Sequence, residues 1–267
     1  MNVDLLKRNL APLLPEAWAA VDDEARRVLT LNLAGRKLVD FSGPFGWKFA
    51  SVNTGKLVLL EDAIAPEVKA GIREVQPLVE LRTPIFLNLM ELDSVARGAT
   101  APDLGAVVEA AERIARAEDN ALFHGYAAGK IRGIVESSPH DPITVAGAQD
   151  WPRAVGAAKE KLKDAGVGGP YALALGIAAY DEITAGGQDG YPLRKRIDSL
   201  LSGPLVWAPS LTGAVLVSTR GGDFELTVGQ NLSIGYAFHD RDTVELYLAE
   251  SFTFRVLEPA AAVALTR

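Results

Sequence analysis

The side chains that most often carry chemistry are scarce in this sequence. Its three histidines, His124, His140 and His239, lie far apart, and none stands four residues from another as helical zinc ligands do. The chain has no cysteine, which excludes disulfides, thiolate nucleophiles and cysteine metal sites. It also lacks a Gly-x-Ser-x-Gly segment that would expose a serine nucleophile. The sequence therefore predicts neither a metal centre nor an acyl-transfer site.

Two short segments are similar to functional motifs. Residues 166–169 (Gly-Val-Gly-Gly) begin like a dinucleotide-binding loop, but Tyr171 stands where the third glycine belongs, and a strand rather than a helix is expected next. Residues 239–242 (His-Asp-Arg-Asp) combine a histidine with acidic side chains, which is typical of a solvated turn between strands. We interpret neither segment as a binding site.

Carboxylates are abundant, and two of them interrupt an apolar pattern. Glu118 falls on or near the apolar stripe of a predicted helix, and Glu250 is the charge on the apolar face of a predicted strand. A buried carboxylate needs a partner, and Arg82 or His124 are the candidates for Glu118. The other acids of that helix, Glu109, Glu112 and Asp119, are expected on a solvated face.

The composition is that of a globular protein with an acidic balance. The chain has 267 residues, 48% of them hydrophobic, and a net charge of −7, which allows one large domain or two modest ones. There is no lysine- or arginine-rich block, so we expect no binding to nucleic acid. No run approaches the roughly 18 apolar residues of a membrane helix, and the N-terminus lacks a secretory signal. We therefore expect a soluble, cytoplasmic protein without membrane contacts.

The spacing of apolar residues predicts two long helices and one unusually long strand. Helical spacing runs through residues 15–35, and again from Asp103, a good N-cap, to about Phe123. Apolar and polar residues alternate through residues 244–256. At roughly 3.3 Å per residue this strand would reach about 40 Å, which suits a long, flat subunit.

A hairpin and a region of alternating helices and strands complete the prediction. Residues 215–219 and 224–228 are apolar runs joined by a Gly-Gly turn, whose positive φ angles suit a tight β-hairpin. Upstream, helices are expected at 151–165 and after Pro192, and strands at 171–175 and 205–207.

Between the two long helices the sequence predicts an arm of two extended segments around a loop. Residues 43–47 (Gly-Pro-Phe-Gly-Trp) form a turn, and a strand-like segment at 56–60 and an extended segment at 75–90 follow it. Such an arm cannot bury its own apolar side chains. It needs a neighbouring subunit, which predicts obligate assembly.

Several short motifs follow one another in order along the chain: Gly-Arg-Lys at 35, Gly-Pro-Phe-Gly-Trp at 43, Glu-Leu-Arg-Thr-Pro at 80, Glu-Leu-Asp at 91, Phe-His-Gly at 123, Gly-Pro-Tyr at 169, Gly-Tyr-Pro-Leu at 190, and blocks at 217–224, 229–236 and 250–254. Together they resemble the encapsulins, the linocin-like shell proteins of bacterial and archaeal nanocompartments. The resemblance implies the α+β fold of tailed-phage major capsid proteins. Its implied parts are a peripheral domain with a long spine helix and long β-strands (1–42, 72–133 and 221–267), an extended E-loop (43–71) and an apical domain (134–220).

The resemblance implies a self-assembling shell subunit rather than an enzyme. Identical copies, about sixty in the smallest icosahedral arrangement, would enclose a cargo enzyme and capture it by a C-terminal targeting peptide. A peroxidase or a ferritin-like iron protein is the expected cargo, with a role in oxidative stress or iron storage. The expected docking residues are Leu29, Arg36, Asp40, Leu232, Ile234 and Tyr236, and the expected fivefold pore loop comprises Thr184, Gly186, Gly187, Gln188, Asp189 and Gly190.

One cofactor and two other functions are alternatives to be weighed against the shell subunit. Some encapsulins hold a flavin against an aromatic residue next to the Glu-Leu-Asp motif, but Met90 stands at that position, so we expect no cofactor. A prophage-type major capsid protein would share the fold, but DNA packed against an acidic lining is unfavourable. A linocin-type bacteriocin or peptidase would need a nucleophile and a base, which the sequence lacks.

Overall fold

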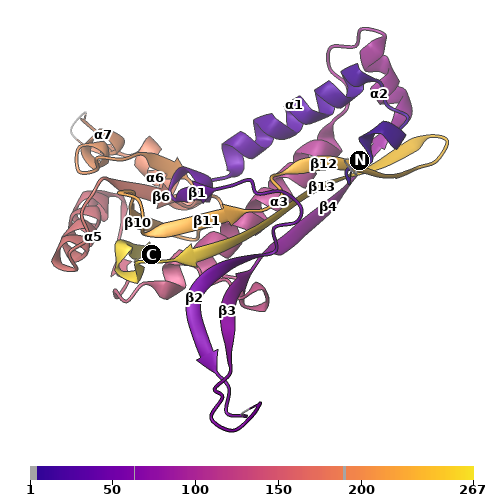
Figure 1. The fold of residues 1–267 in the computed structure, drawn as a ribbon. Helices are drawn as coiled ribbons and strands as arrows, with labels where there is room; N and C mark the ends of the chain where they lie inside the picture. The colour runs from indigo at the N-terminus through magenta and orange to yellow at the C-terminus, as the bar shows by residue number, and fades with distance from the viewer. Residues whose placement is uncertain (1–4, 63, 189–190) are drawn as a thin grey trace.

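A computed structural model describes residues 5–62, 64–188 and 191–267. Its helices pack against two mixed β-sheets, and one long two-stranded ribbon stands apart from them (Figure 1). The helices are α1 (Pro15–Asn32), α2 (Leu89–Ala96), α3 (Gly105–His124), α4 (Ile134–Ser137), α5 (Trp151–Asp164), α6 (Ile177–Ala185) and α7 (Leu193–Asp198). The strands are β1 (Asp40–Ser42), β2 (Ser51–Leu59), β3 (Gly71–Pro77), β4 (Val79–Asn88), β5 (Ile143–Thr144), β6 (Tyr171–Leu175), β7 (Gly187–Gln188), β8 (Tyr191–Pro192), β9 (Leu205–Trp207), β10 (Ala214–Ser218), β11 (Phe224–Val228), β12 (Ser233–His239), β13 (Thr243–Val256) and β14 (Ala262–Thr266).

Strand β13 is the axis of the first sheet. The sheet has the order β1-β11-β13-β12, and β4 pairs along β13 as well. Alternation of side chains buries Val244, Leu246 and Phe252 on one face, and Glu250 on the same face is fully buried too. The predicted long strand is confirmed, with 14 residues.

Helices α1 and α3 cover the apolar face of this sheet. Helical spacing brings Val21 of α1 and Ile114 of α3 into one buried cluster with Leu246 of β13. Both predicted helices are confirmed, although α3 begins two residues after the expected cap. Asp103 Oδ1 instead accepts a hydrogen bond from the Gly105 amide at 3.0 Å, just ahead of the first turn.

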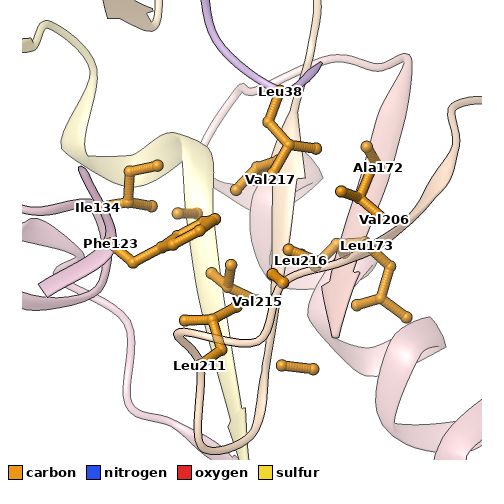
Figure 2. Close-up of a cluster of buried hydrophobic side chains, with 14 of the residues drawn as sticks. Leu38, Phe123, Ile134, Ala172, Leu173, Val206, Leu211, Val215, Leu216 and Val217 are labelled. Atoms are coloured by element: carbon orange, nitrogen blue, oxygen red, sulfur yellow. The ribbon is translucent and has the colours of Figure 1, made fainter. Parts of the chain in front are cut away.

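The second sheet has the order β5-β14-β10-β6-β9. Every residue of β6 and β10 is buried, as expected for central strands covered on both faces. Figure 2 shows part of the surrounding core, in which Leu38 and Phe123, from outside this sheet, share one cluster with Val215 and Val217. The end of the spine helix α3 therefore joins the two sheets through one continuous core.

The predicted hairpin across residues 215–228 is wrong. β10 pairs with β14 and β6, whereas β11 pairs with β13 and β1. Gly221 and Gly222 do take the expected positive φ angles, 87° and 80°, but they carry the chain from one sheet to the other. A glycine turn shows where a chain can change direction, and it does not specify which strands pair afterwards.

Strand pairing also differs from the expected domain limits at two places. β14, which falls in the segment 221–267 assigned to the peripheral domain, lies in the second sheet between β5 and β10. The arm extends beyond 43–71, because β3 continues to Pro77 while paired with β2. The remaining division into peripheral domain, arm and apical domain stays a prediction.

The ribbon of β2 and β3 projects away from both sheets (Figure 1). Its outer half carries large aliphatic side chains in contact with solvent. Leu57 is 58% exposed, Leu59 64% and Ile72 59%. An isolated two-stranded ribbon has no sheet face of its own on which to bury them.

Candidate docking groove

A groove of about 550 Å³ lies between α1 and the segment that leads into β12. Four of the six predicted docking residues line it, namely Leu29, Arg36, Leu232 and Ile234. These residues are far apart in the sequence, but α1 and β12 contribute to the same buried cluster, which brings them together. Their role in docking stays a prediction.

The Arg36 guanidinium forms part of the floor of this groove and is held by three acceptor residues. Nε donates to Glu118 Oε1 at 2.8 Å, Nη1 to Asn231 Oδ1 at 2.9 Å and Nη2 to Glu250 Oε2 at 2.7 Å. Nη2 also donates to Glu118 Oε2. Both glutamate side chains are fully buried, and the Arg36 side chain is 16% exposed. Arg36 therefore neutralises buried carboxylates rather than offering a free cation to a ligand.

Arg36 is the partner of Glu118 that the sequence prediction missed. The expected candidates lie elsewhere, because Arg82 stacks 3.4 Å over a tyrosine ring and His124 contacts a backbone carbonyl. The available signal was a pair of carboxylates, Glu118 and Glu250, each on an apolar face. Two buried acids require a cation between them, but sequence spacing does not say which one.

Burial governs protonation beneath the groove. The pKa of Glu250 is raised well above its ordinary value, first by burial and then by the charge of Glu118, and Arg36 offsets only part of this effect. Burial works against the charge of Arg36, but its hydrogen bond to Glu118 and both glutamate charges raise its pKa. Glu250 Oε1 is buried without a hydrogen-bond partner. Burial therefore disfavours the charged form of Glu250, whereas its carboxylate neighbours favour the charged form of Arg36.

Asp119 is fully buried rather than solvated as expected, because it fixes the turn that carries Arg36. Its carboxylate accepts hydrogen bonds from the amides of Gly35 at 2.8 Å and Ala34 at 3.0 Å. Burial raises the pKa of Asp119 to about 7, although those two amides act in the opposite direction. A Cβ at Gly35 would lie 2.4 Å from Leu122 Cδ2, so a larger residue here would displace that side chain.

The other two predicted docking residues lie outside the groove. Asp40 lines a separate cavity of about 170 Å³, and its Oδ2 accepts a hydrogen bond from the Gly222 amide at 2.6 Å. It holds the turn between the two sheets. Tyr236 donates its amide to the Leu6 carbonyl at 2.8 Å, and its hydroxyl lies 2.6 Å from His239 Nδ1.

The N-terminal segment completes the groove, which the sequence analysis did not anticipate. Leu6 and Arg8 line one side of it. Arg8 forms a two-point ion pair with Asp22 of α1, with distances of 3.2 and 2.7 Å, and its guanidinium lies 3.9 Å from the centre of the Trp18 ring. The sequence signal for this contact was an arginine within the apolar N-terminal segment, just before a helix with acidic side chains.

The predicted pore loop follows α6. The Thr184 hydroxyl and the Gly186 amide both donate to carbonyls of the preceding helical turn, at 2.8 and 2.9 Å. Gly187 and Gln188 form β7, which pairs with β8. Asp189 and Gly190 lie outside the described residues. The place of this loop at a fivefold pore stays a prediction.

Other candidate chemistry is distributed rather than clustered. Within residues 5–62, 64–188 and 191–267, no group of three or more His, Cys, Asp or Glu is arranged to hold a metal ion. His140 Nε2 lies 3.0 Å from a backbone carbonyl. Met90, at the start of α2, is 73% exposed and offers no ring for a flavin. The helices of this described part are all too short or too polar to span a bilayer.

The architecture is that of a capsid subunit. The two sheets, the spine helix α3 and the projecting ribbon form the α+β fold of tailed-phage major capsid proteins. A virus-like particle from Pyrococcus furiosus aligns with a TM-score of 0.63 over 93% of this chain and 97% of that chain, at 14% identity. A structure from Mycobacterium phage Bobi aligns with a TM-score of 0.57 over 88% and 90%, at 13% identity. Such low identities establish the fold alone.

Sequence similarity identifies the family within this fold class. Residues 1–253 match the family described as "encapsulating protein for peroxidase". The type 1 encapsulin shell protein of Rhodospirillum rubrum is 49% identical over 97% of this chain and 95% of the relative. That of Mycolicibacterium paratuberculosis is 43% identical over 98% of each. This chain belongs to the encapsulin family of shell proteins, which confirms the resemblance and the fold expected from its motifs.

Proposed function

We propose that this chain is the subunit of a closed icosahedral shell, about sixty copies in its smallest form, that encloses a cargo enzyme. The observation that supports assembly most strongly is the β2–β3 ribbon, whose exposed aliphatic side chains need a covering surface. Family membership adds to this, because the curated relatives are named shell proteins. The subunit itself catalyses no reaction, and its function is enclosure.

We further propose that the groove beside α1 holds the C-terminal peptide of the cargo. Apolar lining from Leu29, Leu232 and Ile234 suits apolar side chains of an extended peptide. The edge of β12 supports the same mode, because the Tyr236 amide already bonds outward to a second segment. Strand alternation directs the Ile234 amide to the same side. A peptide that adds to this edge would gain main-chain hydrogen bonds and apolar contacts together.

The cargo itself is proposed to be a peroxidase or a ferritin-like iron protein. The family description names an encapsulating protein for peroxidase, which favours the first. A prophage-type capsid function is less well supported, because the phage structures share only the fold, whereas the encapsulin relatives reach 49% identity. The acidic net charge of −7 also disfavours a DNA content.

Assembly is tested on the purified chain by light scattering after size exclusion and by negative-stain microscopy. We expect hollow, uniform particles and an absorbance ratio typical of protein free of nucleic acid. A folded monomer or dimer would contradict the shell function. Particles filled with nucleic acid would support the capsid function instead.

Cargo docking is tested by co-expression with a fluorescent protein that carries the C-terminal tail of a peroxidase or of a ferritin-like protein. We expect the tagged protein inside the particles and the untagged one outside. Leu232→Ser should lower loading by about tenfold, the equivalent of roughly 1.4 kcal/mol. Leu31→Ser is the matched control, because Leu31 is 56% exposed and does not line the groove. Equal loading of both variants would contradict docking here.

A further inference from the structure

A further cavity, of about 310 Å³, lies at the base of the β2–β3 ribbon. It is bounded by both strands of the ribbon, by the segment that follows α3 and by the end of β13. Four cationic side chains line it, against one carboxylate, that of Glu74. The cations are Lys56, Lys130, Arg132 and Arg255. We call this cavity the basic pocket.

The chain itself leaves most of this positive charge without a partner. Arg255 pairs with Glu225, but its Nε is buried without a hydrogen-bond partner. In the described part of the chain, no ion pair involves Lys56, Lys130 or Arg132. The backbone of the pocket is nevertheless fixed, because Gln76 Nε2 of β3 donates to the Lys130 carbonyl at 2.5 Å. A fixed, positively charged pocket of this kind favours an anionic partner.

The tip of the ribbon has the opposite charge. Glu61, Asp62 and Glu67 lie between β2 and β3, all exposed, and Lys69 is the cation near them. Among these acids stands Ile64, the side chain of which is 83% exposed. The tip therefore combines carboxylates with an apolar side chain that has no contact surface of its own.

The tip of one copy cannot reach its own basic pocket. The ribbon runs outward from the pocket, so the five residues from Lys56 to Glu61 separate them by roughly 16 Å at 3.3 Å per residue. Figure 1 shows the ribbon directed away from the body. The complementary tip must come from another molecule.

We propose that the acidic tip of the ribbon in one copy binds the basic pocket at the ribbon base of a neighbouring copy. Glu61 and Asp62 pair with Lys130 and Arg132, and Ile64 covers Leu257, which lines the pocket and is 49% exposed. This inference rests on the proposed shell assembly and specifies its contact. The contact joins two different surfaces, so every copy supplies one tip and one pocket.

The character of the pocket favours this occupant over a free anion. Its lining includes apolar side chains of Val256, Leu257 and Pro259 beside the cations. A small inorganic anion would use only the cations, whereas the tip of the ribbon supplies carboxylates and an aliphatic side chain together. Opposite charges on the two surfaces also fix the order in which copies join.

A charge-reversal cycle tests the contact. The first variant carries Lys130→Glu and Arg132→Glu, the second carries Glu61→Lys and Asp62→Lys, and the third carries all four substitutions. We expect the yield of particles to fall about tenfold or more in each of the first two, because like charges then face each other. The third should recover particles, which also shows that the substituted chain folds. Lys161→Glu with Lys163→Glu on α5 is the matched control and should assemble normally.

The outcomes separate this inference from the function on which it rests. Normal particles from the first variant, or no recovery in the third, would overturn the contact while the shell function stands. Loss of inorganic phosphate binding in the first variant with assembly intact would also overturn it and assign the pocket to a small anion. A wild-type chain that forms no particles would overturn the shell function and the contact with it.

Discussion

The floor of the docking groove buries charged side chains, whereas the β2–β3 ribbon exposes aliphatic ones. Beneath the groove, Arg36 joins two fully buried glutamates inside the subunit. On the ribbon, Leu59 and Ile72 are aliphatic side chains in contact with solvent. The buried charges are compensated within one chain, whereas the exposed aliphatic side chains are covered only by a neighbouring copy. The comparison separates what the subunit needs to fold from what it needs to assemble.

The largest effect on folding is expected from Arg36→Met. Removal of the cation leaves Glu118 and Glu250 buried and uncompensated, and loss of one partner from a buried ion pair costs about 3–5 kcal/mol. Guanidinium unfolding followed by circular dichroism should show this loss, or the variant should be insoluble. Arg8→Met is the control, because its pair with Asp22 is partly exposed and should contribute about 1 kcal/mol or less.

A compensated variant sharpens the same test. Arg36→Met combined with Glu118→Met and Glu250→Met removes the whole ionisable cluster. Well-packed apolar residues can replace a buried ionic cluster without loss, so this variant should recover most of the lost stability. If Arg36→Met alone unfolds at the wild-type denaturant concentration, the cluster does not support the fold as described.

The next effect is a dependence of stability on pH that originates beneath the groove. Asp119 has a pKa of about 7 in the folded chain against its ordinary 3.8. The folded state therefore keeps a proton that the unfolded state loses between these values. The contribution of this proton is fully present below pH 3.8 and is lost as the pH rises to about 7. Within that window the free energy of unfolding should fall by up to about 1.4 kcal/mol per pH unit. The raised pKa of Glu250 acts in the same direction.

Unfolding midpoints measured from pH 5 to pH 8 would check this expectation. Lys37 and Glu118 also act on Asp119, so the comparison uses Asp119→Asn, which should flatten the slope. Glu112→Gln changes an exposed carboxylate of the same helix and should leave the slope as it is. A wild-type stability that rises across this range would contradict the assignment.

Local sequence patterns predicted the helices and strands of this fold better than the pairing between the strands. The long strand β13 and the helices α1 and α3 follow from the spacing of their apolar residues. The Gly221-Gly222 turn was located correctly, but β10 and β11 enter different sheets, because both faces of β10 are covered while β11 pairs along β13. Pairing of strands is a tertiary property that a turn signal does not carry.

The docking groove was predicted in part, and for a similar reason. The family motifs identified Arg36 as a site residue, but its ties to Glu118 and Glu250 are set by packing between segments that are distant in the sequence. The contribution of Leu6 and Arg8 was missed, because the N-terminal segment has little secondary structure and its position depends on contacts with α1 and β12.

A smaller loss of stability is expected from a change where the N-terminal segment contacts the first sheet. The Tyr247 hydroxyl donates to the Leu5 carbonyl at 3.1 Å, and its ring lies across Gly235, which has no Cβ to displace it. Tyr247→Phe removes this hydrogen bond and should lower stability by about 1 kcal/mol. Faster amide exchange in residues 5–8 should accompany the loss. Unchanged exchange would mean that Tyr247 does not hold this segment.

The smallest effect on subunit stability is expected from Leu59→Ser combined with Ile72→Ser, and this variant tests the other side of the comparison. Both side chains are more than half exposed, so their removal should change the free energy of unfolding by about 0.5 kcal/mol or less. Assembly should nevertheless fail, because the ribbon loses the aliphatic surface that a neighbour covers. Light scattering should then report folded single subunits with a near-wild-type unfolding midpoint. Intact particles would show that the ribbon does not carry the assembly, whereas an unfolded subunit would show that folding and assembly are not separable in this chain.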